Sequence, residues 1–270
     1  MRLFAAFMLA LAIPGASVAA ETPYTLPHSV EQVVHAEGGE AYRILIAWPD
    51  APPPPAGYPV LYVLDGEDHF AIAALTARRL ARAGGRSGVM DGIVVGIAAG
   101  PLQRRVRDYT PVTPGWTIPA TMPASGLRTG GAEAFLDLLE RQVQPLVRQR
   151  WRVDRSRETL LGHSFGGLLA LHAALTRPAM VDGVVAVSPS LWFGDGLIMR
   201  EAAAAKGTPP ILIAESDTAA AAPAALARSL DPGANDGRAR FLPLPGQSHG
   251  TTMLAAMAPA IHFAFAGPGR

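Results

Sequence analysis

The feature that most constrains the fold is a glycine-rich turn between an apolar strand-like run and an apolar helix-like run. The run at 158–162 leads into Gly-His-Ser-Phe-Gly-Gly at 162–167, and the apolar run 168–171 follows. A sharp strand-to-helix turn of this kind lifts the side chain of its central serine above the edge of a sheet. The pattern therefore predicts that Ser164 is exposed at the junction of a strand and a helix.

The glycines and the first helical amide of this turn extend the prediction. We expect backbone segments to approach closely at Gly162 and Gly166, so that neither position accepts a side chain. Phe165 is the first residue of the predicted helix, so its N–H has no acceptor within that helix. This N–H is predicted to face an oxyanion that develops beside Ser164. The alternative is a helix-packing turn whose serine only caps the helix.

Strand-like runs alternate with helical patterns along the rest of the chain. Strands are predicted at 42–48, 60–64, 92–98, 158–162, 183–188, 210–214 and 239–244, and helices at 70–82, 132–150, 165–176 and 252–265. This alternation predicts an α/β fold with a mostly parallel central sheet and helices on both faces. Pro145 is expected to kink its helix. The proline-rich stretch 101–131 lacks periodicity and is predicted to be a long loop.

The first 20 residues have the pattern of a signal peptide. Arg2 precedes an apolar run at 3–13, and Pro14 and small residues lead up to Ala20. Such a run is shorter than the ~20 residues that a transmembrane helix needs but fits a signal-peptide core. We therefore expect cleavage after Ala20, export to the periplasm, and one mature domain over 21–270. No other stretch is long and apolar enough to cross a membrane.

Charge balance and the absence of cysteine exclude several functions. The chain has 23 basic and 22 acidic residues, so it lacks the excess of cations that nucleic-acid binding needs. Without cysteine, thiol catalysis, thiolate zinc sites and disulfides are excluded. The acidic and histidine side chains at 65–69 match no zinc-binding spacing, so neither a metal nor a cofactor is expected.

A serine nucleophile needs a general base, and His249 is predicted to supply it. In a sheet of this kind the nucleophile, the acid and the histidine follow one another along the chain. Of the seven histidines, His249 lies in a polar loop between the last strand and the last helix. His163 is expected to pack under the turn, and His172 to be a satisfied core or surface residue in its helix. The alternative for His249 is a solvated loop histidine.

The acid that orients His249 should follow the strand at 210–214. Asp217 is the first choice and Glu215 the alternative, with surface solvation as the competing explanation for either. A Ser–His pair without a close carboxylate is also consistent with the sequence. The second oxyanion donor is predicted to be the N–H of Gly66, with that of Glu67 as the alternative, in the loop after the strand at 60–64.

Substrate-binding residues are predicted in two segments near these groups. Arg104, Arg105 and Arg107 would favour an anionic substrate through charge-assisted hydrogen bonds, with solvation at the surface as the alternative. Trp116 and Trp192 are predicted to form aromatic walls, with core packing as the alternative.

Five segments together resemble the putative-esterase branch of the α/β-hydrolases, which contains the siderophore esterases. These segments are Tyr-Pro-Val-Leu-Tyr-Val-Leu-Asp-Gly at 58–66, Arg-Asp-Tyr-Thr-Pro at 107–111, Gly-Gly-Ala-Glu-Ala-Phe-Leu at 130–136, Gly-His-Ser-Phe-Gly-Gly-Leu at 162–168 and Ser-Pro-Ser-Leu-Trp at 188–192. His249 completes the pattern. The resemblance implies an exported Ser–His hydrolase with the α/β-hydrolase fold, whose arginine-rich loops suit an anionic ferric catecholate.

The function predicted from these residues and this resemblance is that of a periplasmic serine esterase. Its expected substrate is a small-molecule ester, first of all the trilactone of a catecholate siderophore of the enterobactin type. A general carboxylesterase or an acyl-thioesterase is the alternative within the class. From another class, a periplasmic ligand-binding protein on a hydrolase scaffold would need neither Ser164 nor His249. Reaction with a fluorophosphonate probe distinguishes the two classes.

Overall fold

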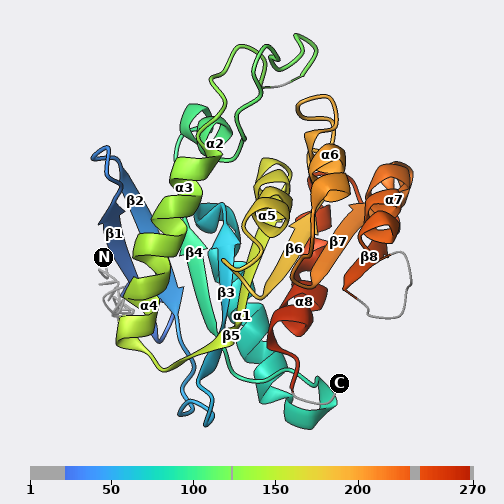
Figure 1. Ribbon diagram of the computed structural model, residues 1–270. Coiled ribbons are helices and arrows are strands. Elements are labelled where there is room, and N and C mark those ends of the chain that lie inside the picture. The colour runs from blue at the N-terminus through green and yellow to red at the C-terminus, as the bar shows by residue number, and fades with distance from the viewer. Residues whose placement is uncertain (1–21, 123, 232–237, 268–270) are drawn as a thin grey trace, which may run out of the picture.

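The computed structural model describes residues 22–122, 124–231 and 238–267, so the predicted signal peptide lies outside the described residues. One eight-stranded sheet crosses the molecule in the order β1-β2-β4-β3-β5-β6-β7-β8 (Figure 1). The strands are β1 (Ser29–His35), β2 (Ala41–Ala47), β3 (Tyr58–Leu64), β4 (Ile93–Ile97), β5 (Val153–His163), β6 (Gly183–Val187), β7 (Ile211–Ser216) and β8 (Ala239–Leu244).

The sheet is mostly parallel, which confirms the predicted α/β-hydrolase fold class. β2 pairs antiparallel with both β1 and β4, and every other neighbouring pair is parallel. β3, β4, β6 and β7 are buried along their whole length. Their nearly unbroken apolar sequences are therefore those of parallel strands with both faces covered.

Helices cover the sheet on both sides. They are α1 (Gly66–Arg82), α2 (Leu102–Asp108), α3 (Ala132–Leu138), α4 (Gln144–Arg150), α5 (Phe165–Thr176), α6 (Leu197–Ala204), α7 (Ala221–Leu230) and α8 (Thr252–Phe265). α1 and α8 lie behind the sheet in Figure 1, where their apolar residues form one core with it. The larger core lies on the other face, beneath α3, α4 and α5. α5 is buried on every side except at Thr176, so it is the central helix of that layer.

The structure contains short elements that the sequence analysis did not predict. β1 is an edge strand that pairs only with β2, and α6 follows an irregular turn. α2 lies inside the stretch 101–131 predicted to be a loop, because seven residues are too few to show a helical period. The predicted kink in the helix at 132–150 corresponds to a π-helical turn, Leu139–Val143, before Pro145.

The sequence predicts no membrane-spanning segment after the first 20 residues. None of the helices in these segments has the length and apolar character that spanning a bilayer requires.

Candidate active site

Ser164 stands between the end of β5 and the start of α5, as predicted. Its backbone has φ 59° and ψ −116°, a conformation that costs a non-glycine residue roughly 1–3 kcal/mol. Backbone hydrogen bonds hold it there: its N–H donates to Val187 O at 3.0 Å, and its carbonyl accepts from Leu168 N at 2.9 Å and Ser190 N at 3.1 Å. The Ser164 hydroxyl is half-buried and lies 3.5 Å from Ser190 Oγ. The strained backbone of this turn therefore places the Ser164 hydroxyl at the edge of the sheet.

The glycine prediction for this turn is right at one position and wrong at the other. A Cβ on Gly162 would overlap the carbonyl of Gly166, so no side chain fits there. A Cβ on Gly166 would instead meet Leu64 and Asp65 at 3.5 Å, which is ordinary contact. The close approach on the helical side is at Gly167, where a Cβ would lie 3.0 Å from Pro189 Cα, because it is this residue that faces the loop after β6.

Two helix N-termini supply the predicted backbone donors. Phe165 is the first residue of α5 and Gly66 is the first residue of α1, so neither N–H has an acceptor within its own helix. Asp65 precedes α1 with a left-handed backbone, φ 53°, and its N–H donates to Tyr109 Oη at 3.1 Å. The contact of Gly166 with Leu64 and Asp65 shows that the start of α1 lies against the first turn of α5.

Arg105 connects the loop before α1 to the turn that carries Ser164. Its Nε and Nη2 donate to the two oxygens of Asp65 at 2.6 and 2.8 Å, and Nη2 also donates to the carbonyl of His163 at 3.2 Å. Burial alone would lower the pKa of this guanidinium, but the bonds to Asp65 raise it above its usual value. Arg105 is thus a fixed positive charge, bonded to the carbonyl of the residue that precedes Ser164.

The His249 loop lies beside the residue that precedes Ser164. The rings of His163 and His249 have centroids 4.8 Å apart, and His163 Nε2 lies 2.9 Å from the carbonyl of His249. His249 itself is exposed. Within the described residues the Ser164 hydroxyl has its hydrogen bond with Ser190 and none with His249, so the Ser–His pair remains a prediction.

Of the two predicted acids, Asp217 bonds the loop of His249 directly, and Glu215 is linked to it only through Ser188 and Thr252. Glu215 is buried, and its Oε1 accepts from Ser188 Oγ at 2.8 Å. Ser188 Oγ is also 2.8 Å from Thr252 Oγ1, which donates to the His249 carbonyl at 3.0 Å. Asp217 is exposed, and its Oδ1 accepts from the N–H of Gly246 at 3.3 Å. Their roles in orienting the base remain predictions.

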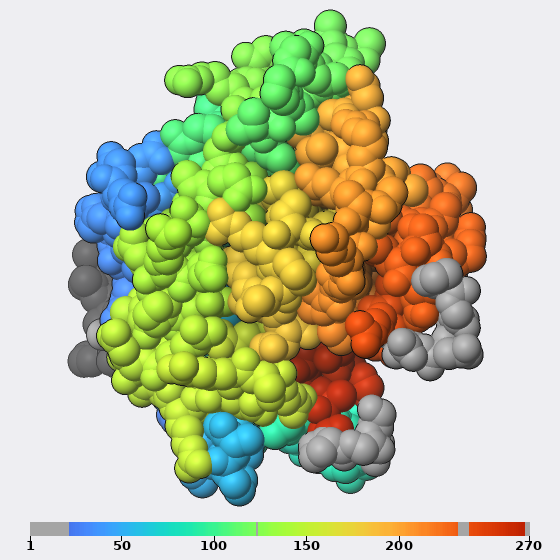
Figure 2. Space-filling view, in the orientation of Figure 1, coloured from blue at the N-terminus to red at the C-terminus, as the bar shows by residue number. Residues whose placement is uncertain are grey.

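The predicted aromatic residues form one cluster beside Ser164. The ring of Phe165 lies 5.8 Å from Trp192, and Trp116 lies 4.7 Å from Phe193. Trp116 Nε1 donates to Asp195 Oδ1 at 3.0 Å. These contacts attach the segment between α2 and α3 to the turn before α6, at one end of the face seen in Figure 2. Both tryptophans are half-buried, so each has packed and accessible surface.

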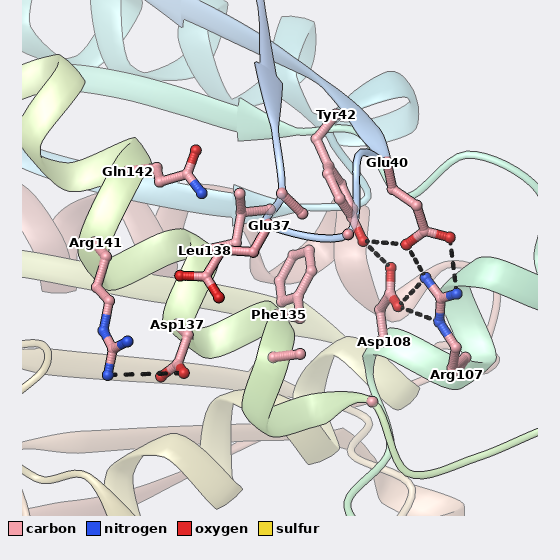
Figure 3. A pocket seen from close by; sticks show the side chains of 14 residues that line it. Glu37, Glu40, Tyr42, Arg107, Asp108, Phe135, Asp137, Leu138, Arg141 and Gln142 are labelled. Atoms are coloured by element: carbon pink, nitrogen blue, oxygen red, sulfur yellow. Dashed lines mark hydrogen bonds and ion pairs between the residues drawn. The ribbon is translucent and has the colours of Figure 1, made fainter.

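Arg104 and Arg107, predicted to bind substrate, are engaged with the protein. Arg104 donates to the carbonyls of Ala99 and Ala41 at 2.8 and 2.9 Å. Arg107 bonds Glu40 and Asp108. It lines a cavity of about 350 Å³ between the β1–β2 turn and α3, which Ser164 and His249 do not line (Figure 3). A substrate role for either arginine stays a prediction.

Some features of the site were not predicted from the sequence. The Arg105–Asp65 pair joins residues 40 positions apart, and the ring contact between His163 and His249 joins residues 86 apart. In the sequence, the Arg105–Asp65 pair was indicated only by the arginines at 104–107. Within the segments that the structure describes, no group of three or more His, Asp and Glu side chains is arranged to hold a metal ion.

The fold and this site define the class of protein. A serine on a strained turn between a parallel strand and a buried helix has the arrangement of the nucleophile turn in α/β-hydrolases. The family model described as "Putative esterase" matches residues 36–231. The chain therefore belongs to this esterase family.

Siderophore esterases are among the relatives in sequence. The siderophore triacetylfusarinine C esterase of Aspergillus fumigatus is 38% identical over 188 residues, which are 68% of this chain and 63% of that protein. The ferri-bacillibactin esterase BesA of Bacillus subtilis is 32% identical over 184 residues, 66% of this chain and 64% of that protein. The matches thus span slightly less than two thirds of these relatives.

Solved structures share the fold over most of the chain. The BES protein from Bacillus cereus has a TM-score of 0.81 at 22% identity and covers 92% of this chain and 99% of its own. The enterobactin hydrolase IroE in complex with DFP has a TM-score of 0.69 at 26% identity and covers 87% and 93%.

Proposed function

We propose that this chain is an exported serine esterase that hydrolyses the ester bonds of a siderophore. The observation that carries the proposal is the strained Ser164 at the β5–α5 junction, beside the N-terminus of α5 and the clamped guanidinium of Arg105. A half-buried hydroxyl held in a strained turn, at a helix N-terminus and beside a bonded guanidinium, fits nucleophilic attack on a carbonyl. A cap or packing serine needs none of these features.

The proposed reaction has two half-reactions. Ser164 Oγ attacks the ester carbonyl carbon while His249 accepts the hydroxyl proton, and the alkoxide that leaves takes that proton from His249. Water then attacks the acyl-enzyme with His249 again as the base, which releases the acid and restores Ser164. The oxyanion of both tetrahedral intermediates is stabilised by the N–H groups of Phe165 and Gly66 and by the charge of Arg105.

The substrate is proposed from the relatives and from the aromatic cluster. The relatives are named as esterases of triacetylfusarinine C and of ferri-bacillibactin, both siderophore substrates. Phe165, Trp192 and Trp116 present aromatic surface beside Ser164. Because aromatic rings stack on aromatic faces, we propose the trilactone of a catecholate siderophore as the substrate. We propose the periplasm as the location because the first 20 residues have the pattern of a signal peptide.

The first experiment tests the nucleophile. The purified protein should be labelled covalently by a fluorophosphonate probe, and Ser164→Ala should abolish the label. Hydrolysis should fall at least roughly 10³-fold in Ser164→Ala, since removal of a serine nucleophile leaves only binding and oxyanion stabilisation. An unlabelled wild-type protein would support a ligand-binding function.

The second experiment tests the substrate. Ferric enterobactin and short p-nitrophenyl esters are compared by kcat/KM, and we expect the siderophore to be the better substrate. If only the small esters are hydrolysed, the protein is a general carboxylesterase and siderophores are not its substrates.

A further inference from the structure

The side chain of His163 has no part in the proposed chemistry, yet it connects the nucleophile turn to the loop of His249. His163 Nε2 lies 2.9 Å from the carbonyl oxygen of His249, and the two rings are tilted by 40° with centroids 4.8 Å apart. Thr252 Oγ1 donates to the same carbonyl at 3.0 Å. The backbone of the predicted base is therefore held by two donors, one of them the neighbour of Ser164.

The surroundings of His163 keep its imidazole uncharged. Burial first, and then the nearby His249, lower the pKa of His163 to about 4. The groups that face it from the packed elements are all cationic when charged: His69 of α1, with ring centroids 6.3 Å apart, Arg105 of α2 and His249. Because the acceptor at Nε2 is a carbonyl, Nε2 must carry the proton of the neutral ring.

We propose that His163 is a positioning residue for His249: its Nε2–H fixes the His249 backbone, and its neutral ring supports the His249 imidazole at the nucleophile turn. The inference rests on the proposed function, because it matters only if His249 is the base. A neutral neighbour also does not oppose the proton that His249 receives from Ser164, whereas a charged one would. His163 touches no reacting atom in this scheme and acts only through His249.

Two substitutions separate the two contacts. His163→Phe keeps an aromatic ring against His249 but removes the donor, and His163→Gln keeps an N–H donor at a similar reach but removes the ring. We expect kcat on a p-nitrophenyl ester to fall roughly 10–100-fold in His163→Phe, with KM within about twofold, because general-base catalysis depends on geometry. His163→Gln should restore kcat to within about fivefold of wild type.

Three results would overturn the inference. One is a His163→Phe variant with wild-type kcat. Another is an equal loss of kcat in both variants with an equal fall in melting temperature, which would make His163 a residue of the fold only. The third is an NMR titration of the wild-type protein in which His163 titrates near the ordinary histidine pKa, which would show that its ring is not held against His249. We expect the ring to stay neutral down to about pH 4.

Failure of the proposed function gives a different result. In that case the wild-type protein is not labelled by the fluorophosphonate probe and hydrolyses no ester, whatever residue stands at 163. The NMR titration still decides whether His163 is held against His249.

Discussion

At the scale of single residues, the two carboxylates near His249 show what chain order predicts and what it does not. The order of nucleophile, acid and base led to Glu215 and Asp217, and hydrogen bonds connect both to the loop that carries His249, directly for Asp217 and through other side chains for Glu215. Chain order does not determine where a carboxylate points. Asp217 bonds the backbone of Gly246, and Glu215 reaches the His249 carbonyl only through Ser188 and Thr252.

Substitution of these carboxylates distinguishes loop anchoring from orientation of the ring. Asp217→Asn keeps an oxygen that accepts from Gly246 N–H, so we expect kcat/KM to fall less than about tenfold. A triad acid that holds the histidine ring would cost about 10⁴-fold. The measurement is ester hydrolysis with labelling of Ser164 as the check on the active fraction. A thousandfold loss would make Asp217 the residue that orients the ring.

Glu215→Gln is the matched comparison. Glu215 is buried and accepts from Ser188 Oγ and Ser216 N, so the amide replaces a charge-assisted bond by a neutral one. We expect the free energy of unfolding to fall by roughly 1–2 kcal/mol and kcat/KM to fall less than about tenfold. Urea unfolding and ester hydrolysis measure the two effects. A large kinetic loss without loss of stability would transfer the orienting role to Glu215.

At the scale of elements, the turn between β5 and α5 was predictable because its signal is local. The apolar strand, the glycines and the apolar helix are contiguous in sequence, and α5 begins and ends where the sequence predicted. The error at Gly166 arose because spacing alone does not show which glycine of the first helical turn faces the loop after β6. Elements whose partners are distant or few were missed: β1 pairs only with β2, and α2 buries only Val106 and Asp108.

A pair of alanine substitutions tests the packing of this turn. Gly162→Ala places a Cβ against the carbonyl of Gly166, so we expect a loss of several kcal/mol or failure to fold. Gly166→Ala meets only ordinary contacts within a helix, and alanine there should change stability by no more than about 1 kcal/mol, toward stabilisation. Thermal melting measures both. Equal destabilisation by the two substitutions would contradict the packing described for this turn.

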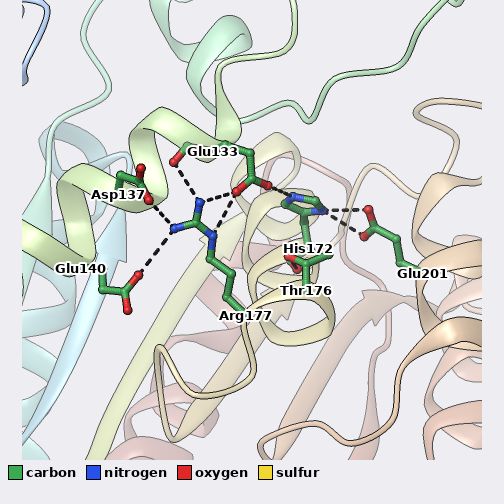
Figure 4. Close-up of polar contacts among 7 residues, drawn as sticks. All are labelled: Glu133, Asp137, Glu140, His172, Thr176, Arg177 and Glu201. Carbon is green, nitrogen blue, oxygen red and sulfur yellow. Dashed lines mark hydrogen bonds and ion pairs between the residues drawn. The ribbon is translucent and has the colours of Figure 1, made fainter.

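At the scale of the whole molecule, a charge network around the buried His172 connects the helices of one layer. His172 of α5 bonds Glu201 of α6 through Nδ1 at 2.8 Å and Glu133 of α3 through Nε2 at 2.8 Å (Figure 4). Arg177 of the segment after α5 bonds Glu133 and Asp137. A satisfied histidine is predicted at this position from the sequence, but its partners on two other helices could not be predicted because they lie 29 and 39 residues away.

The protonation of His172 gives the fold a dependence on pH. Burial would lower its pKa, but the bonds to Glu201 and Glu133 outweigh burial and raise it above the usual value. The folded state therefore binds this proton more tightly than the unfolded chain, so the stabilisation is complete below the unfolded pKa of about 6.5 and is lost as pH rises through the folded pKa. His163 acts in the opposite direction: its pKa of about 4 makes the folded state lose stability as pH falls from about 6.5 toward 4.

We therefore expect the free energy of unfolding to fall on both sides of neutral pH, with His172 responsible for part of the alkaline fall. His172→Gln should cost roughly 1.5–3 kcal/mol at pH 6, because hydrogen bonds to charged groups are lost. It should also flatten the decline above pH 6.5, since glutamine does not titrate. Urea unfolding of both proteins from pH 5 to pH 9 measures the two curves. If the curves stay parallel above pH 6.5, His172 is not the group whose deprotonation loosens α3, α5 and α6.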